Sequence, residues 1–490
     1  MKKIISIILL LTSPDAFSVN YYVSTTGNDS NSGMNPANAF LTLQHASDAV
    51  IPGDSVIVFA GIYSGFYHTT SGSSVNRIVF KAQEGTVIDT PNAITQDGIN
   101  LEGASYITIE GFRLENMPRA GIRSVTNTDV RIFNNYCTGC GRWGILTGFS
   151  ENVVIEQNIC EYSELEHGIY HGNSADNPHI FKNTCRYNHA AGIHMNADAS
   201  LGGDGIISNA LVEQNIIYEN GVGGGSGINC DGVQNSVIQN NYIYLNHASG
   251  ISLYQIDAAA PCHGTAVINN SIVQPDDARW GLNITNGSAD VVVFNNVILS
   301  DHAFRGSITA DAISIQSLSC NHNVLSDRMS IDDGETNMTL QEWFEETAQD
   351  ANSQISVIDE IFTYTSAEDF EPTFPGFLIE MGAQNFAGHE APVTDIIDFS
   401  RPFYLNYDIG CFEFVFFSVE EMNHRKRAWS DIPAQTSVQL FNVAGQLIGQ
   451  KNKMDWEPQK LSEAIYVFYY TNEKGETITG KYFANWPGKR

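Results

Sequence analysis

The chain has little positive charge for its size. Its 490 residues include 25 lysines and arginines against 55 aspartates and glutamates, which gives a formal net charge of −30. Such an acidic balance argues against general affinity for nucleic acid or anionic lipid, because both would repel the protein. If the protein acts on a polyanion, local basic residues or a bound cation must overcome that field.

Long hydrophobic runs are lacking after the first residues. The apolar stretch 4–11 follows Lys2 and Lys3 and precedes small residues at Ala16 and Ser18, an arrangement typical of a secretory signal peptide. We expect residues 1–18 to be removed by cleavage after Ser18. A membrane-spanning helix needs about 20 apolar residues. The sequence therefore predicts no transmembrane segment and a soluble, exported mature protein.

Two short patterns recur through the middle of the chain with one period, which indicates one structural unit per period. In the first pattern, segments such as VIEQNIC and VFNNVIL share a final asparagine, found at Asn135, Asn158, Asn183, Asn215, Asn241, Asn270 and Asn296. In the second, a glycine precedes isoleucine or leucine, at Gly98, Gly121, Gly144, Gly168, Gly192, Gly227, Gly250 and Gly281.

Each unit holds short alternating runs rich in Val, Ile and Tyr and bounded by Gly, Asn and Asp, which is the pattern of β-strands. A period in the twenties with stacked strands indicates a solenoid. Leucine-rich repeats have a similar period, but their leucine spacing is missing. An asparagine at one turn of every coil suits a parallel β-helix, where amides bond along the stack. We predict an all-β fold, a right-handed parallel β-helix solenoid.

Three of the eight cysteines follow a ladder asparagine by two residues, so Cys137, Cys160 and Cys185 should stack on successive coils. Disulfides are common in exported proteins. A column of small buried side chains nevertheless explains this placement better than a disulfide does. Cys137 and Cys140 have C-x-x-C spacing, but no second pair or histidine cluster completes a zinc site.

Both ends of the repeat resemble those of secreted β-helix proteins, including pectate and alginate lyases. Residues 21–63, beginning YYVSTTGND, are similar to the start of that group, which implies an amphipathic helix at about residues 41–50. Such a helix would cap the open end, which every solenoid must protect. TLQEWFEETAQDANS and DIIDFSRPFYLNYDIGCFEF resemble the closing segment, although Phe399 and Cys411 replace a common glycine and alanine.

The C-terminal residues 437–490 are similar to the sorting domain of type IX secretion cargo, through SVQLFNVAGQLIGQ and LSEAIYVFYYTNEKGETITGKYFANW. The resemblance implies a small β-sandwich, the type IX machinery as a partner, and a secreted or cell-surface protein. The predicted organisation is a signal peptide at 1–18, a parallel β-helix at 19–330, its closing segment at 331–415, a linker at 416–436 and the sorting domain at 437–490.

The repeat also predicts which side chains face outward. In each Gly-Ile strand the isoleucine points inward, so the first and the third residues after the isoleucine point outward. Because coils lie about 4.8 Å apart, the outward residues of neighbouring coils should form one polar face, made of Tyr170, His194, Asn196, Asn229, Asp231 and Tyr254. Long insertions that begin at residues 196 and 254 should wall it as a groove for a linear polymer. His167 and His171 should point inward with Ile169.

Elimination from a uronate needs a group that neutralises the C5 carboxylate, a base for the C5 proton and an acid for the leaving oxygen. The predicted catalytic residues are Tyr170, His194 and Arg123, and the predicted substrate-binding residues are Asn196, Asn229, Asp231 and Tyr254. Asp231 and Asp198 are the predicted ligands of Ca²⁺, if calcium is bound. Many pectate and alginate lyases use a lysine base, whereas coils 100–296 contain one lysine, Lys182, on another face. We therefore hypothesise that tyrosine and histidine side chains take the acid and base roles in the elimination.

Three functions stay open. The leading one is a secreted carbohydrate-active enzyme, a polysaccharide lyase that cleaves an acidic glycan by β-elimination. A glycoside hydrolase, which needs two carboxyl groups about 5–9.5 Å apart, could pair Asp231 with Glu166, Asp198, Asp204 or Asp257, and a C5-epimerase could use the same face. A noncatalytic glycan-binding or adhesin protein is the third, and it predicts no turnover.

Overall fold

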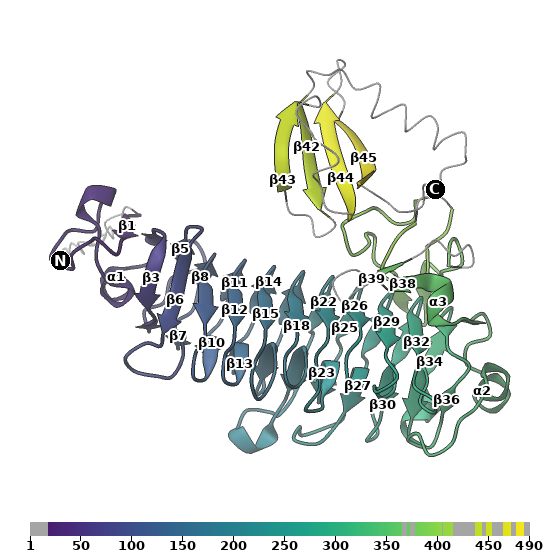
Figure 1. Cartoon of the computed structure of the whole chain (residues 1–490). Helices are drawn as coiled ribbons and strands as arrows, with labels where there is room; N and C mark the ends of the chain where they lie inside the picture. The colour runs from purple at the N-terminus through teal and green to yellow at the C-terminus, as the bar shows by residue number, and fades with distance from the viewer. Residues whose placement is uncertain are drawn as a thin grey trace, which may run out of the picture.

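The computed structural model describes residues 18–364, 370–372, 378–403, 405–414, 437–442, 447–452, 464–471 and 477–484. The predicted linker 416–436 and nearly all of the predicted signal peptide lie outside these ranges. Within the described residues, no helix is long and apolar enough to cross a membrane. Residues 20–355 form the predicted parallel β-helix, a row of stacked coils (Figure 1).

Each complete coil contributes one strand to each of three parallel sheets, in the order A, B, C along the chain, and the first and last coils are incomplete. Sheet A contains β1 (Asn20–Val23), β2 (Ser55–Val58), β5 (Ile78–Ala82), β8 (Ile107–Glu110), β11 (Arg131–Phe133), β14 (Val154–Glu156), β17 (His179–Phe181), β21 (Leu211–Glu213), β25 (Val237–Gln239), β28 (Ala266–Ile268), β31 (Val292–Phe294) and β34 (Ser319–Asn321). Sheet B contains β3 (Gly61–Ser64), β6 (Thr86–Thr90), β9 (Arg113–Glu115), β12 (Tyr136–Thr138), β15 (Ile159–Glu161), β18 (Thr184–Arg186), β22 (Ile216–Tyr218), β26 (Tyr242–Tyr244), β29 (Ser271–Gln274), β32 (Val297–Ser300), β35 (Val324–Leu325) and β37 (Gln354–Ile355).

Sheet C carries the predicted polar face. It contains β4 (Phe66–His68), β7 (Ile99–Glu102), β10 (Ala120–Val125), β13 (Trp143–Gly148), β16 (Ile169–Gly172), β19 (Ile193–Asn196), β23 (Ser226–Asp231), β27 (Ser249–Tyr254), β30 (Leu282–Ile284), β33 (Ile308–Ala310) and β36 (Met329–Ser330). The last solenoid strand, β37, lies inside the segment that we predicted to close the helix.

The predicted asparagine ladder lies at the turn between sheets A and B. Asn183 Nδ2 donates to Asn215 Oδ1 at 3.0 Å, and Asn215 Nδ2 donates to Asn241 Oδ1 at 2.9 Å. Each Nδ2 also donates to a carbonyl of the preceding coil, as Asn215 does to Ile180 at 2.9 Å. Because the ladder amides are buried and hydrogen-bonded, they satisfy one another along the stack. A second ladder that we did not predict joins Asn188, Asn220 and Asn246 between sheets B and C.

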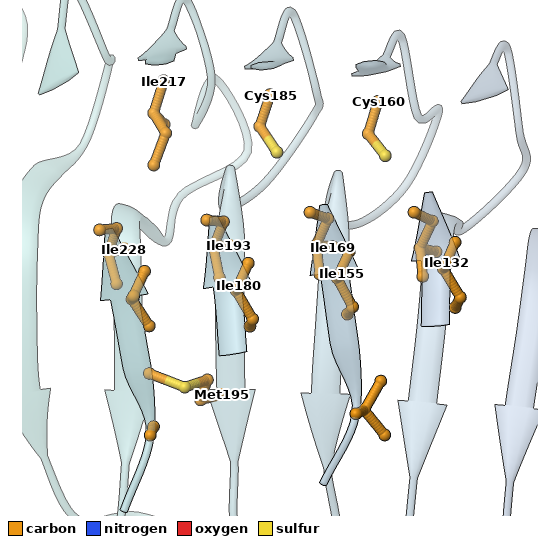
Figure 2. Close-up of a cluster of buried hydrophobic side chains, with 14 of the residues drawn as sticks. Ile132, Ile155, Cys160, Ile169, Ile180, Cys185, Ile193, Met195, Ile217 and Ile228 are labelled. Atoms are coloured by element: carbon orange, nitrogen blue, oxygen red, sulfur yellow. The ribbon is translucent and has the colours of Figure 1, made fainter. Parts of the chain in front are cut away.

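The Gly-Ile repeat has a packing cause. A Cβ added to Gly144 would lie 2.9 Å from Cys160 Cβ, and one added to Gly121 would lie 2.8 Å from Cys137 Sγ. Cys137, Cys160 and Cys185 are aligned by strand pairing, and all eight cysteines are buried free thiols. The predicted buried column is thus confirmed, and its row continues into Ile217 (Figure 2).

Helices cover both ends of the core. Helix α1 (Leu43–Ala49) lies at the first coils, inside the predicted range, and buries Leu43 and Ala46. Helix α2 (Leu340–Thr347) lies at the other end, where Trp343 is fully buried and its Nε1 donates to Asp350 Oδ2 at 3.0 Å. A one-turn helix, α3 (Ile358–Ile361), follows. These contacts keep the apolar ends of the stack away from water.

Residues 378–414 return along the outside of sheets A and B. Their buried side chains, including Ile409 and Cys411, pack on Tyr242, Val273 and Leu299. Asn269 Nδ2, at the turn between the two sheets, donates to the backbone oxygens of Asp408 and Gly410 at 2.9 and 3.0 Å. This segment therefore packs on the outside of sheets A and B over the later coils, and the described contacts of its side chains lie on these two sheets.

The C-terminal strands form one antiparallel sheet in the order β43-β42-β44-β45. They are β42 (Ser437–Asn442), β43 (Leu447–Asn452), β44 (Ala464–Thr471) and β45 (Thr477–Ala484). The predicted sandwich would need a second facing sheet, and the described part of this region forms one sheet.

Candidate functional site on sheet C

Strand pairing confirms the predicted outward columns. Tyr170 pairs with His194, and His194 pairs with Asn229. One column further along the strands, Asn196 pairs with Asp231, which pairs with Tyr254. The isoleucines that precede the first column, Ile169, Ile193 and Ile228, are fully buried and point into the core (Figure 2). Four successive strands, β16, β19, β23 and β27, therefore bring the six predicted residues together.

The two predicted loops meet at the end of these strands. In the first loop, Ala199 N donates to Asp257 O at 3.0 Å, and in return Ala259 N donates to Gly205 O at 3.0 Å. The first loop contains the short helix η2 (Ala199–Leu201). Two backbone bonds between the loops hold them as one wall beside Asn196.

Asp231 holds that wall. Its Oδ1 accepts the N–H of Ile256 at 2.9 Å and of Ala258 at 3.4 Å, and its Oδ2 accepts the N–H of Asp257 at 2.7 Å. The residue is 1% exposed, and burial raises the pKa of its carboxyl group against the effect of these donors. Both carboxylate oxygens therefore bind the loop, so Asp231 positions the wall in addition to its predicted roles in binding substrate and Ca²⁺.

The centre of the face is a chain of hydrogen-bonding groups. His167 Nε2 lies 2.9 Å from His194 Nδ1, and His194 Nε2 lies 3.4 Å from Tyr254 Oη. Asn229 Nδ2 donates to the same tyrosine oxygen at 2.6 Å. Tyr254, predicted to bind substrate, thus has its hydroxyl group at the end of a network of neutral donors.

The prediction for His167 was wrong. His171 does point inward, where its ring bonds Thr147 Oγ1 and the carbonyl of Ala175. His167 instead lies on the outer face, with its ring stacked on Tyr170 at 5.6 Å. The cause is the corner at Gly168, where the chain enters the strand: the alternation of side chains holds within a strand and not across a turn.

Tyr170 leans across its own strand. A Cβ on Gly172 would lie 2.7 Å from the Tyr170 ring, so the missing side chain provides the space for it. The ring also contacts His194 edge-on at 5.3 Å and Trp143 at 5.7 Å. Aromatic neighbours on three sides hold the hydroxyl group in one region of the face.

Burial sets the protonation of these groups. It lowers the pKa of His194 to about 4 and that of His167 well below its ordinary value, the latter with help from His194 and Arg142. Burial raises the pKa of Tyr170 to about 12, assisted by nearby carboxylates, and raises the pKa of Tyr254 still further from its ordinary value. At neutral pH the site therefore combines uncharged imidazoles with protonated phenols.

The field around the site is negative. Asp198, Glu166 and Asp257 all act on the Tyr170 hydroxyl group. The guanidinium of Arg142 is bound to Glu166 and lies over the ring of Trp143. No group of His, Cys, Asp and Glu side chains suited to a metal ion occurs among the described residues. A ligand carboxylate would therefore meet several like charges.

Arg123 stands apart from the other predicted catalytic residues. It pairs with Leu146, which separates it from Tyr170, so it lies two coils away, or about 10 Å by coil spacing. Its guanidinium is ion-paired with Glu102 and donates to Asn100 Oδ1 at 3.0 Å. These partners neutralise the charge of Arg123, which the sequence predicts to be catalytic.

The side-chain oxygen of Asn196 lies at the centre of the face and has no hydrogen-bond partner in the part of the chain that the structure describes. Asn196 is nearly buried, its Nδ2 approaches Asp257 Oδ2 at 3.4 Å, and its Oδ1 accepts no hydrogen bond from the described residues. Buried acceptors without a partner are uncommon, and each calls for an explanation. A hydroxyl group of a bound ligand would supply the missing donor.

Comparison with known proteins agrees with this architecture. A family described as periplasmic copper-binding protein (NosD) matches residues 47–224, and one described as right handed beta helix region matches residues 166–316. No curated protein matches the chain.

Solved structures extend the comparison over most of the chain. Pectate lyase Pel9A is 16% identical, with 82% of this chain and 98% of that chain covered and a TM-score of 0.53. XylC in complex with xylose is 12% identical, with 81% and 98% covered and a TM-score of 0.53. GH136 lacto-N-biosidase from Eubacterium ramulus is 15% identical, with 69% and 68% covered and a TM-score of 0.52. At these identities the likeness concerns the fold, and the fold is a right-handed parallel β-helix.

Proposed function

We propose that this protein is an exported carbohydrate-active enzyme that cleaves an acidic glycan by β-elimination on the outer face of sheet C. The observation that carries the proposal is the hydrogen-bond network around Tyr254. Its Oη accepts a hydrogen bond from Asn229 Nδ2 at 2.6 Å and lies beside the neutral His194, and Tyr170 lies on the same face. The names of the similar structures, which include a pectate lyase and a lacto-N-biosidase, support a carbohydrate substrate.

In the proposed reaction, Tyr170 first loses its proton to solvent and then takes the C5 proton of a uronate. The C4–O bond breaks as a double bond forms between C4 and C5, and Tyr254 gives its hydroxyl proton to the leaving oxygen. Asn229 Nδ2 already points at the Tyr254 oxygen, so the phenolate that forms there keeps a donor in place. Two phenols with different partners thus take the base and acid roles.

Hydrolysis is the second candidate, because burial raises the pKa of Asp231 as a general acid would require. We favour elimination because both Asp231 oxygens accept backbone N–H groups. A C5-epimerase would share the proton abstraction but would retain the glycosidic bond. The noncatalytic alternative has no requirement for the phenol groups.

The test is to incubate the mature protein with a panel of uronate and neutral polysaccharides and to follow unsaturated uronate together with reducing ends. A rise in both supports elimination, whereas reducing ends alone support hydrolysis. Loss of C5–H label into water without chain cleavage supports epimerisation. Absence of all three across the panel would favour the binding protein.

The pH dependence separates the two cleavage mechanisms. Because the Tyr170 pKa is raised to about 12, the phenolate base is scarce at neutral pH. We therefore expect kcat/KM to rise with pH through the neutral and mildly alkaline range, about tenfold per unit for a single required deprotonation. A hydrolase that uses protonated Asp231 would instead lose activity as pH rises. Initial rates in overlapping buffers of constant ionic strength distinguish the two.

Calcium remains a proposal, with Asp198 and Asp231 as its predicted ligands. Since both Asp231 oxygens are engaged, the cation would be held by Asp198 together with the substrate carboxylate, and it would neutralise that carboxylate. We expect a chelator to raise KM and added Ca²⁺ to restore it. Sodium chloride of matched ionic strength is the control, because screening alone weakens repulsion between like charges. An unchanged KM in chelator would remove calcium from the proposal.

Export is proposed to use the N-terminal signal and the type IX machinery, the latter through residues 437–490. The periplasmic description of the matching family is compatible with a protein outside the cytoplasm. Deletion of residues 437–490 should retain the protein inside the producing cell, which fractionation would detect. Secretion of the truncated chain at the normal level would contradict this role.

A further inference from the structure

His167 has two hydrogen-bonding neighbours that define its role. Its Nδ1 accepts the backbone N–H of Ala191 at 3.1 Å, and its Nε2 lies 2.9 Å from His194 Nδ1. The nearest carboxylate oxygen, Glu166 Oε2, is 3.9 Å from Nε2, which is beyond hydrogen-bonding distance. Glu166 is itself bound by Arg142. Each ring nitrogen of His167 therefore has one partner.

These contacts determine where the hydrogens are. A backbone N–H can only donate, so His167 Nδ1 must accept, and the single hydrogen of the neutral ring lies on Nε2. That hydrogen can bond only to a bare His194 Nδ1, since two N–H groups would repel each other at 2.9 Å. The hydrogen of His194 is then on Nε2, the nitrogen 3.4 Å from Tyr254 Oη.

We propose that His167 is a positioning residue that fixes His194 in the Nε2–H tautomer, so that His194 and Asn229 both present N–H groups to the Tyr254 oxygen. Its effect on catalysis depends on the proposed function, whereas the tautomer itself does not. In this arrangement His194 is a hydrogen-bond donor rather than the base, because its Nδ1 lone pair is already bound. The donors are oriented before substrate arrives, which is how preorganised groups stabilise a developing oxyanion.

The tautomer can be measured without any activity. Histidine-selective ¹⁵N labelling of the mature protein reports which ring nitrogens carry hydrogen. Because Thr147 and Ala175 bond both His171 nitrogens, this buried ring serves as an internal reference. In the wild type we expect hydrogen on His194 Nε2 and none on Nδ1. Hydrogen on His194 Nδ1 would overturn the proposal.

Two substitutions test the cause. His167→Gln keeps an acceptor and a donor on one planar group, so the His194 pattern should persist. His167→Leu removes both, and His194 should become a mixture of tautomers, with kcat reduced about 100-fold and KM little changed. His263→Gln is the control, because His263 is an exposed histidine paired with Asp290. An unchanged His194 pattern in His167→Leu would contradict the proposal. If that variant does not fold, the wild-type and Gln spectra still decide.

If the wild type has the expected tautomer and no substrate is turned over, the proposed function fails and the positioning role of His167 stands. If activity is found but His194 carries its hydrogen on Nδ1, the positioning role of His167 fails and the proposed function stands.

Discussion

Replacing Tyr254 by phenylalanine is expected to lower kcat/KM by about 10²- to 10⁴-fold, the range typical of a lost general acid. The substitution removes the hydroxyl group that accepts a hydrogen bond from Asn229 Nδ2 at 2.6 Å and faces His194 Nε2. It leaves the ring, and hence the packing of β27, in place. The measurement is initial rate against concentration of the substrate found in the polysaccharide panel.

Stability should change little in this variant. Asn229 loses one acceptor at a partly exposed site, which costs about 1 kcal/mol, so the melting temperature should stay close to that of the wild type. Tyr162→Phe is the matched control, since Tyr162 follows strand β15 of sheet B, is exposed and stacks on Tyr187. Full activity in Tyr254→Phe would exclude it as the acid, and loss of activity in the control would make the test uninformative about this site.

Replacing Asn215 by alanine is expected to destabilise the solenoid by about 3–6 kcal/mol. Its Nδ2 donates to Ile180 O and Asn241 Oδ1, and its Oδ1 accepts both the backbone N–H and the Nδ2 of Asn183. Alanine removes all four of these hydrogen bonds, each worth about 1 kcal/mol, and leaves the buried Asn183 N–H without its acceptor, which costs about 1–3 kcal/mol. Asn183 Nδ2 keeps Ile155 O and Phe181 O as acceptors, and Asn241 Oδ1 keeps the backbone N–H of residue 215. The loss is large because the defect lies in the middle of the ladder, where neighbouring coils depend on each other.

The measurement is the thermal midpoint, followed by circular dichroism, together with the denaturant midpoint. Asn352→Ala, at an exposed asparagine near the end of the solenoid, is the control and should be close to neutral. Equal midpoints for the two variants would show that ladder amides contribute no more than surface ones. Asn215→Asp should also destabilise, since a carboxylate cannot donate to Asn241 Oδ1.

Much of the fold follows from the sequence because the repeat determines it locally. Asn215 and Asn241 occupy one position of successive coils, and that position has one environment, so a pattern in the chain becomes a column in space. The same argument predicts Tyr170 beside His194 and Asn196 beside Asp231, and strand pairing confirms both. Periodicity within strands carries that information.

Roles within the site were harder to predict, because they depend on contacts outside the periodic strands. His167 lies at a corner, where alternation does not apply, and its stacking on Tyr170 has no signal in the sequence. Asp231 was read as a ligand-binding carboxylate, but a loop of irregular length folds back onto both of its oxygens. Arg123 is predicted from the sequence to be catalytic, but its guanidinium is paired with Glu102.

The sequence by itself determined the parallel β-helix, the asparagine ladder, the cysteine column and the membership of the polar face, because each follows from a short repeat acting through strand alternation and coil spacing. Only the tertiary structure decided which of those polar groups are hydrogen-bonded to one another, which charges are already paired, and that the closing segment packs on the later coils of sheets A and B. Those outcomes depend on insertions, corners and long-range contacts that occur once, and a feature that occurs once leaves no periodic signal to read.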